Sequence, residues 1–103
     1  MYKMLITTTD REDLGIKISK DILKEKLSPC VQIIKNIDSN YIWGNKIENS
    51  KECIILIKCK KKNVDKIKSL IQKQHNYNVP ELIAFNIDLL DKKYQSWFDK
   101  NSI

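Results

Sequence analysis

The chain has 103 residues, a mass of 12.1 kDa and a formal net charge of +6, and its length allows one domain with one hydrophobic core. Because apolar residues make up 42% of the chain and glycine and proline together only four positions, a disordered or collagen-like chain is excluded. The longest apolar run, residues 53–57, is far shorter than the roughly 20 residues that span a bilayer, and residues 1–10 reach polar side chains too soon for a signal peptide. We therefore expect a cytoplasmic protein that has no membrane partner.

The positive charge comes almost entirely from lysine, since Arg11 is the only arginine among the 19 basic residues. Sequence-specific contacts to guanine and phosphate favour the planar guanidinium of arginine over the lysine ammonium. Apart from residues 58–62, the lysines are also dispersed along the chain. We therefore expect no nucleic-acid partner.

The first half of the chain predicts a strand, a helix and a hairpin, in that order. Residues 4–8 read as a short strand, and the spacing of Thr9 and Glu12 predicts a capping box at the start of a helix. The helix is expected to end before Pro29, because the residue before a proline is disfavoured in helical geometry. Its inward face, read from the helical spacing of apolar residues, is expected to carry Leu14, Ile18, Ile22 and Leu23.

Two strands are predicted at residues 30–37 and 52–59, with a hairpin at residues 41–47 whose Gly44-Asn45 pair tolerates positive φ. Asn63 is expected to cap a second helix, and residues 82–87 form a fourth strand. The inward face of the second helix is expected to carry Val64, Ile67, Leu70 and Ile71. A C-terminal helix is predicted from the spacing of Leu90, Tyr94, Trp97 and Phe98.

This order predicts an α+β fold of the ferredoxin-like β-α-β-β-α-β kind, with a C-terminal helix, as a single domain over residues 1–103. Its four-stranded antiparallel sheet carries two helices on one face, so the other face has no helical cover. Neighbouring strand residues such as Ile54 and Ile55 point to opposite faces, and both are apolar. We therefore expect self-association to cover the second face.

Four segments carry a resemblance to a known family, within a match that runs from about residue 5 to residue 98. They are SPCVQIIKNIDSNYIWGNKI at 28–47, ECIILIKCK at 52–60, HNYNVPELIAFNI at 75–87 and YQSWF at 94–98. In order and spacing they resemble the CutA family of divalent-cation-tolerance proteins. The resemblance implies a ferredoxin-like subunit in a tight homotrimer, without an established enzymatic reaction and with a role in the response to metal ions.

The resemblance also implies a metal site for copper or another divalent cation, formed in some members by a first-strand cysteine and two consecutive histidines. Here Thr7 stands at the first-strand position and Gln74 at the first histidine, so that only His75 matches. We take His75 and Cys30 as the candidate metal ligands, which requires them to lie within about 4 to 5 Å of each other. The alternatives are a structural hydrogen bond for His75 and an inert, packed thiol for Cys30.

Five further residues are candidates for a polar cleft. Glu52, Lys58 and Glu81 are charges within apolar strand contexts, so they either pair with one another or line a cleft. Tyr77 and Trp97 are the aromatic candidates of the same cleft, although aromatic side chains more commonly fill cores and interfaces. Cys53 and Cys59 are separated by an even number of strand positions and are expected to pack in the core.

A second functional hypothesis follows from these residues. A trimer that resembles the PII-like signalling proteins would have clefts between its subunits, and Lys58, Lys60 and His75 would hold a small anionic effector there. Neither hypothesis predicts an enzyme, because the sequence has no Walker loop, nucleotide fingerprint or Ser-His-Asp set.

Overall fold

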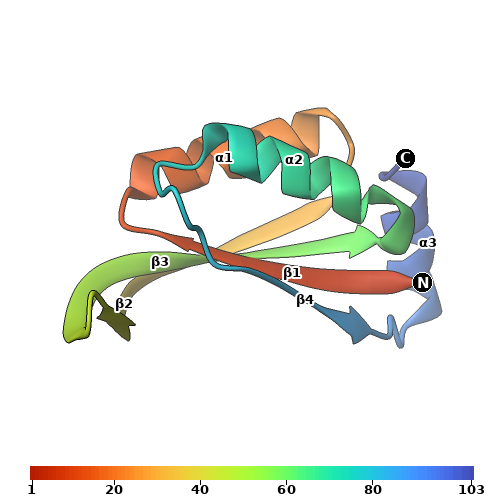
Figure 1. Cartoon of the computed structure of the whole chain (residues 1–103). Helices are drawn as coiled ribbons and strands as arrows, with labels where there is room; N and C mark the ends of the chain where they lie inside the picture. The colour runs from red at the N-terminus through yellow and green to blue at the C-terminus, as the bar shows by residue number, and fades with distance from the viewer.

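The computed structural model describes all residues from Met1 to Ile103 and has the predicted ferredoxin-like arrangement. The elements are β1 (Tyr2–Thr9), α1 (Glu12–Lys24), β2 (Cys30–Trp43), β3 (Lys46–Lys60), a 3-10 turn (Lys61–Asn63), α2 (Val64–Gln74), β4 (Leu82–Ile87) and α3 (Lys92–Lys100). The antiparallel sheet has the order β2-β3-β1-β4. Figure 1 shows α1 and α2 on one face of the sheet, and α3 at the end of the sheet that holds the N-terminus.

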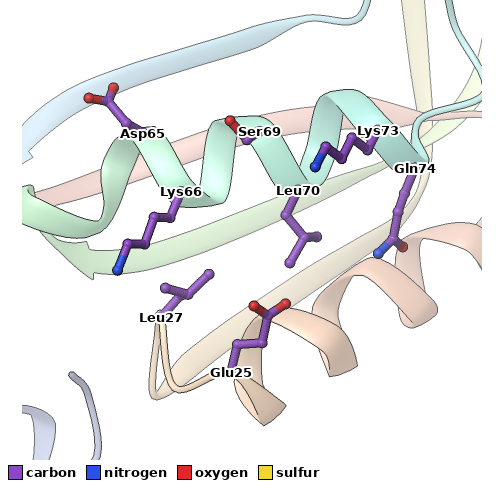
Figure 2. Close-up of a pocket in the computed structure, with 8 residues that line it drawn as sticks. All are labelled: Glu25, Leu27, Asp65, Lys66, Ser69, Leu70, Lys73 and Gln74. Carbon is purple, nitrogen blue, oxygen red and sulfur yellow. The ribbon is translucent and has the colours of Figure 1, made fainter.

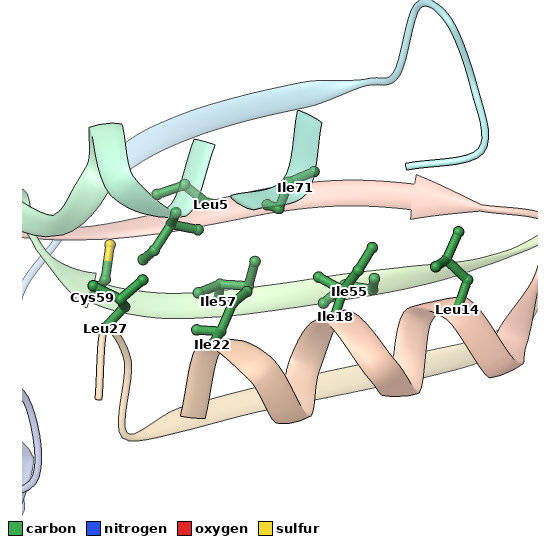
Figure 3. Close-up of a cluster of buried hydrophobic side chains, with 10 residues drawn as sticks. Leu5, Leu14, Ile18, Ile22, Leu27, Ile55, Ile57, Cys59 and Ile71 are labelled. Atoms are coloured by element: carbon green, nitrogen blue, oxygen red, sulfur yellow. The ribbon is translucent and has the colours of Figure 1, made fainter. Parts of the chain in front are cut away.

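The core lies between the two long helices and the sheet. Figure 3 shows side chains of α1, such as Ile18 and Ile22, against Ile55 and Ile57 of β3; all four are fully buried. Cys53 and Cys59 are also buried on this side, which confirms their predicted role in packing. Amphipathic helices and the alternate residues of the strands therefore form one apolar layer, as their periodicities predict.

The β2–β3 hairpin is longer than predicted. Instead of separate strands, residues 30–43 and 46–60 form one continuous ladder that carries a β-bulge between Ile34 and Ile37. Polar side chains across the strands support its outer part, where the Tyr41 and Ser50 hydroxyls lie 2.9 Å apart. The predicted turn is confirmed, because Gly44 and Asn45 have φ values of +56° and +64°. In Figure 1 this hairpin curves away from the helical layer.

The start of α1 differs from the prediction, because Thr9 and Glu12 do not form a capping box. Arg11 is at the N-cap without a side-chain cap bond, and the Glu12 carboxylate is 3.0 Å from Lys35 Nζ. The Thr9 hydroxyl accepts the Arg11 N–H at 3.2 Å and donates to Asn76 Oδ1 at 2.7 Å. Thr9 thus joins the end of β1 to the loop after α2.

The end of α1 also comes earlier than predicted. The helix ends at Lys24, and Lys26 takes a left-handed φ of +56°. The Leu27 N–H then donates to Ile22 O at 3.2 Å, a bond that closes the helix in the manner of a Schellman motif. Leu23, predicted to face inward, is 39% exposed beside this turn.

Two other predicted helix starts need correction. Asn63 is at the N-cap of α2 but makes no cap bond; its buried amide donates to Leu27 O at 3.3 Å and to Ile103 O at 3.0 Å. The cap of α3 is Asp91, which accepts the Tyr94 N–H at 2.9 Å. Leu90 therefore lies outside the helix and is almost fully exposed.

Candidate functional site

A cleft of about 770 Å³ lies between the β2–β3 hairpin and the loop that joins α2 to β4. Thr8 at the end of β1 and Glu52 on β3 contribute to one part of its wall, and residues 77–81 of the loop contribute to another. The remaining lining residues, 38–41 and 43, belong to β2. The cleft therefore depends on segments that are far apart in the sequence and are joined by the sheet.

A hydrogen bond joins two lining residues of this cleft, Tyr77 and Glu52. The Tyr77 hydroxyl donates to Glu52 Oε2 at 2.6 Å, and Glu52 is only 9% exposed. Burial, followed by the hydrogen bond to Glu52 and the charge of that carboxylate, raises the pKa of Tyr77 far above its ordinary value. Tyr77 therefore stays a neutral hydrogen-bond donor to Glu52.

His75 holds the loop in place through both of its ring nitrogens. The Tyr77 N–H donates to Nδ1 at 3.0 Å, so Nδ1 carries no proton, and Nε2 is then the donor to Thr8 O at 2.7 Å. The two rings also lie against each other, with centroids 4.9 Å apart. His75 thus ties the loop to β1 and orients Tyr77 toward Glu52, which leaves no free lone pair on the imidazole for a metal ion.

Cys30 belongs to a different cluster, beside α3. It is half-buried and lies opposite Lys58 in the sheet register, with Lys58 Nζ 3.9 Å from its Sγ. The same ammonium is 3.4 Å from the Tyr94 hydroxyl, and Trp97 stacks beside Tyr94 with ring centroids 5.5 Å apart. This thiol, ammonium and aromatic group occupy the end of the sheet near the N-terminus.

The structure does not bring His75 and Cys30 together within one chain. In the register, Cys30 is level with Lys58, which pairs with Met4, whereas His75 contacts Thr8. The four residues from Met4 to Thr8 correspond to about 13 Å along β1. Two side chains that each lie about 2.0 to 2.3 Å from the same ion cannot be that far apart. No group of three His, Cys, Asp or Glu side chains in the chain is placed to hold a metal ion. The residues of a single chain therefore do not fit a copper or zinc site.

The five predicted cleft residues separate into two groups. Glu52, Tyr77 and Glu81 line the cleft together, but Lys58 and Trp97 do not. Glu52 and Lys58 are six residues apart on β3, or about 20 Å in an extended strand. An even separation along β3 puts both on one face of the sheet, but the distance along the strand separates them.

Two lining residues of the cleft, Asp38 and Asn40 on β2, are not among the predicted site residues. Both lie in the segment 38–40, which falls between the predicted strand and the predicted hairpin. Ile37 and Tyr41 have the same strand parity, but the polar Ser39 between them interrupts the period-2 signal that would have extended the strand over these positions.

A second hollow, of about 510 Å³, lies on the opposite side of the molecule between α1 and α2. Figure 2 shows that Leu27 and Leu70 are its only apolar side chains and that charged groups such as Glu25, Lys66 and Lys73 surround them. None of the predicted site residues lies there. We regard it as a solvated groove between two packed helices.

With the fold and the cleft established, comparison with known proteins gives a consistent result. The family described as "CutA1 divalent ion tolerance protein" matches residues 3–101. The chain belongs to the CutA1 family. Among solved structures, CutA1 from Oryza sativa has a TM-score of 0.94 at 28% identity, covering 99% of this chain and 94% of that chain. CutA1 from Shewanella sp. SIB1 has a TM-score of 0.93 at 34% identity, covering 98% and 94%.

The CutA relatives differ in length and in the location that their names print. The chloroplastic protein CutA of Arabidopsis thaliana is 32% identical over 96% of this chain but only 54% of its own length, so the chain spans about half of that relative. The divalent-cation tolerance protein CutA of Thermus thermophilus is 28% identical over 99% of both chains. A structure from Archaeoglobus fulgidus is described as periplasmic. No helix of this CutA1 chain is long and apolar enough to cross a membrane.

Proposed function

We propose that this CutA1 chain acts in divalent-cation tolerance as a cytoplasmic, non-enzymatic homotrimer. The observation that carries the proposal is the uncovered apolar face of the sheet. Three large apolar side chains are each about half exposed on this face: Ile34 on β2, and Ile83 and Phe85 on β4. Large exposed apolar patches are uncommon on soluble monomers. The family description supports a tolerance role and names no reaction.

The two edges of the sheet support assembly as well. β2 and β4 are the outer strands, so each has a row of backbone groups without a partner strand in the chain. Such edges pair readily with another chain unless something covers them. α3 covers only one end of the sheet, where its Phe98 ring lies 5.5 Å from that of Tyr2 and its Tyr94 hydroxyl lies 3.4 Å from Lys58 Nζ (Figure 1). Further copies of the chain would cover both the face and the edges.

We expect the native protein to have three times the 12.1 kDa mass of one chain when measured by light scattering after gel filtration. Phe85→Asp should lower that mass, because a carboxylate on the apolar face would be buried without a partner. The control is Leu90→Asp, which places the same charge at an almost fully exposed position outside the sheet and should keep the trimer. A native protein of single-chain mass would contradict the proposal.

The metal-binding part of the proposal depends on this assembly. Since one chain offers neither a close His75–Cys30 pair nor a chelating group of three side chains, we propose that copper or another divalent cation is held weakly and between copies. Calorimetric titration of the reduced trimer with Cu(I), Cu(II) and Zn(II) should show weak binding that the Phe85→Asp variant lacks. His75→Ala and Cys30→Ser test the two candidate ligands separately. Tight binding by single chains of the Phe85→Asp variant would contradict a site between copies.

A further inference from the structure

The positive charge of the chain is concentrated on its helical layer. This layer, defined here as residues 11–27 and 61–74, consists of α1, α2 and the turns next to them. It carries ten basic and five acidic side chains, and so holds five of the six net positive charges of the chain. Because the proposed assembly covers the opposite face of the sheet and the sheet edges, the helical layer stays open to solvent in the trimer.

Most cations of the helical layer have no counter-ion within the chain. Arg11 is paired with Asp13, with Nη2 and Oδ2 2.7 Å apart, and Lys17 is paired with Asp21 at 2.8 Å. The other eight, all lysines, take part in none of the chain's four ion pairs, and all eight are exposed. Three of the five acidic side chains of the layer are already paired. The free charge of this surface therefore favours an anionic partner.

The lysines are densest on α2 and the 3-10 turn before it. Residues 61–74 contain five lysines and one acidic residue, Asp65. Lys66 and Lys73 are seven residues apart, or about two helical turns, so both lie on one stripe of α2. Both also line the groove of about 510 Å³ that α2 forms with α1, and Figure 2 shows the Asp65 carboxylate pointing away from this groove.

The groove, which is solvated in the chain alone, adds an apolar contact to the lysine stripe. Figure 2 shows Leu70 between Lys66 and Lys73 along α2, and Leu27 on the facing side. Two helical turns correspond to about 10 Å, a distance that an extended peptide covers in about three residues. A short segment with an apolar side chain between two carboxylates therefore matches this stripe. Glu25, on the α1 side of the groove, would repel such a segment and keep it on the α2 side.

Two other kinds of anionic partner fit the helical layer less well. The layer contains no aromatic side chain on which the bases of a single-stranded nucleic acid could stack, and its only arginine is already paired with Asp13. Its only exposed large apolar side chain is Leu23, so it lacks the apolar face that inserts into a membrane. Both observations favour a protein partner.

We propose that α2 and its groove bind an acidic segment of a partner protein. Lys66 and Lys73 pair with its carboxylates, and Leu70 contacts an apolar side chain between them. This surface goes beyond the proposed role in cation tolerance. It is exposed on the single chain as well, so binding does not depend on the trimer.

Fluorescence anisotropy of labelled synthetic peptides tests the proposal on the native protein. The probe is acetyl-EELEELEE-amide, and two control peptides replace either its glutamates with glutamine or its leucines with serine. We expect the probe to bind, and its affinity to decrease as the salt concentration is raised from about 50 to about 300 mM. The glutamine peptide should not bind, and the serine peptide should bind about fivefold more weakly than the probe.

Variants of the chain locate the binding surface. The double variant Lys66→Gln with Lys73→Gln should weaken binding of the probe about tenfold at low salt. Its control, Lys92→Gln with Lys93→Gln, removes the same charge from exposed positions on α3 and should change binding less than about twofold. Glu25→Gln should strengthen binding, because it removes the repelling carboxylate. Glutamine forms helices nearly as well as lysine, so these variants should fold, and light scattering on the same samples measures their assembly separately.

Equal losses in the two double variants would overturn the proposal, since binding would then depend on net charge alone. A native protein that does not bind the probe, or that binds the glutamine peptide equally well, would overturn it too. Phosphatidylserine vesicles and a single-stranded oligothymidylate are titrated at the same salt concentrations. Tighter binding of either one, lost when Lys66 and Lys73 are replaced, would assign the surface to a membrane or a nucleic acid instead.

Discussion

Replacing Ile57 with alanine is expected to lower the free energy of unfolding by about 3 to 4 kcal/mol. Ile57 is fully buried on β3 and pairs with Leu5 of β1. Figure 3 places it directly against Ile22 of α1. The substitution removes apolar contact area and leaves a cavity between sheet and helix, where rigid elements on both sides limit relaxation.

The matched control for Ile57→Ala is Ile47→Ala, which makes the same chemical change on the same strand. Ile47 lies at the tip of the hairpin and is 84% exposed, so its truncation should cost less than about 1 kcal/mol. Urea unfolding at one fixed protein concentration measures both values, because assembly makes stability depend on concentration. Losses of equal size in the two variants would show that the core is not where Figure 3 places it.

Most of the fold could be predicted from the sequence because it depends on local periodicity. The period-2 pattern of the strands placed Ile54 and Ile55 on opposite faces, and only Ile55 is fully buried, on the helical face. The same pattern predicts an apolar face of the sheet that no helix covers, and Ile83 and Phe85 are half exposed there. The Gly44-Asn45 turn was predictable for the same reason, because its backbone conformation depends on those two residues alone.

The details that failed depend on residues that are distant in the sequence. Thr9 has the spacing of a capping residue, but its hydroxyl is engaged by Asn76, 67 residues away. Asn63 likewise uses its amide for Leu27 and for the C-terminal residues instead of its own helix. A capping signature indicates only the hydrogen bond that a side chain can make to its own helix. A residue distant in the sequence can offer that side chain a more favourable hydrogen bond.

The candidate site was half predictable. Glu52 and Glu81 were selected because charges are unusual in apolar strand contexts, and Tyr77 was selected as an aromatic candidate; the three do share one cleft. Lys58 was selected by the same reasoning but lies beside Tyr94 at the other end of the sheet. Alternation gives the face of a residue, but only the strand register gives its position along that face.

The stability of the protein is expected to fall steeply as the pH rises above about 9. Burial raises the pKa of the Cys59 thiol to about 11 and also raises that of Cys53, because a thiolate in the core would lose its hydration. The unfolded chain releases these protons at lower pH than the folded chain does. Folding stability is therefore complete below the unfolded pKa and decreases while the pH approaches the folded one. For Cys59, two pKa units correspond to a loss of about 2 to 3 kcal/mol.

Tyr77 also makes the folding stability fall as the pH rises, but at higher pH than Cys59. Its folded pKa is also raised, and an unfolded tyrosine titrates near 10, so its contribution decreases only above about pH 10. Urea unfolding of the reduced protein between pH 8 and pH 11 should therefore show a loss that begins near pH 9 and becomes steeper near pH 10. Cys59→Ala should flatten the first part of the curve and Tyr77→Phe the second, whatever each costs at neutral pH. A Cys59→Ala variant with the native slope between pH 9 and pH 10 would mean that this thiol is not buried as the structure has it. The two windows thus test the core and the cleft independently in one experiment.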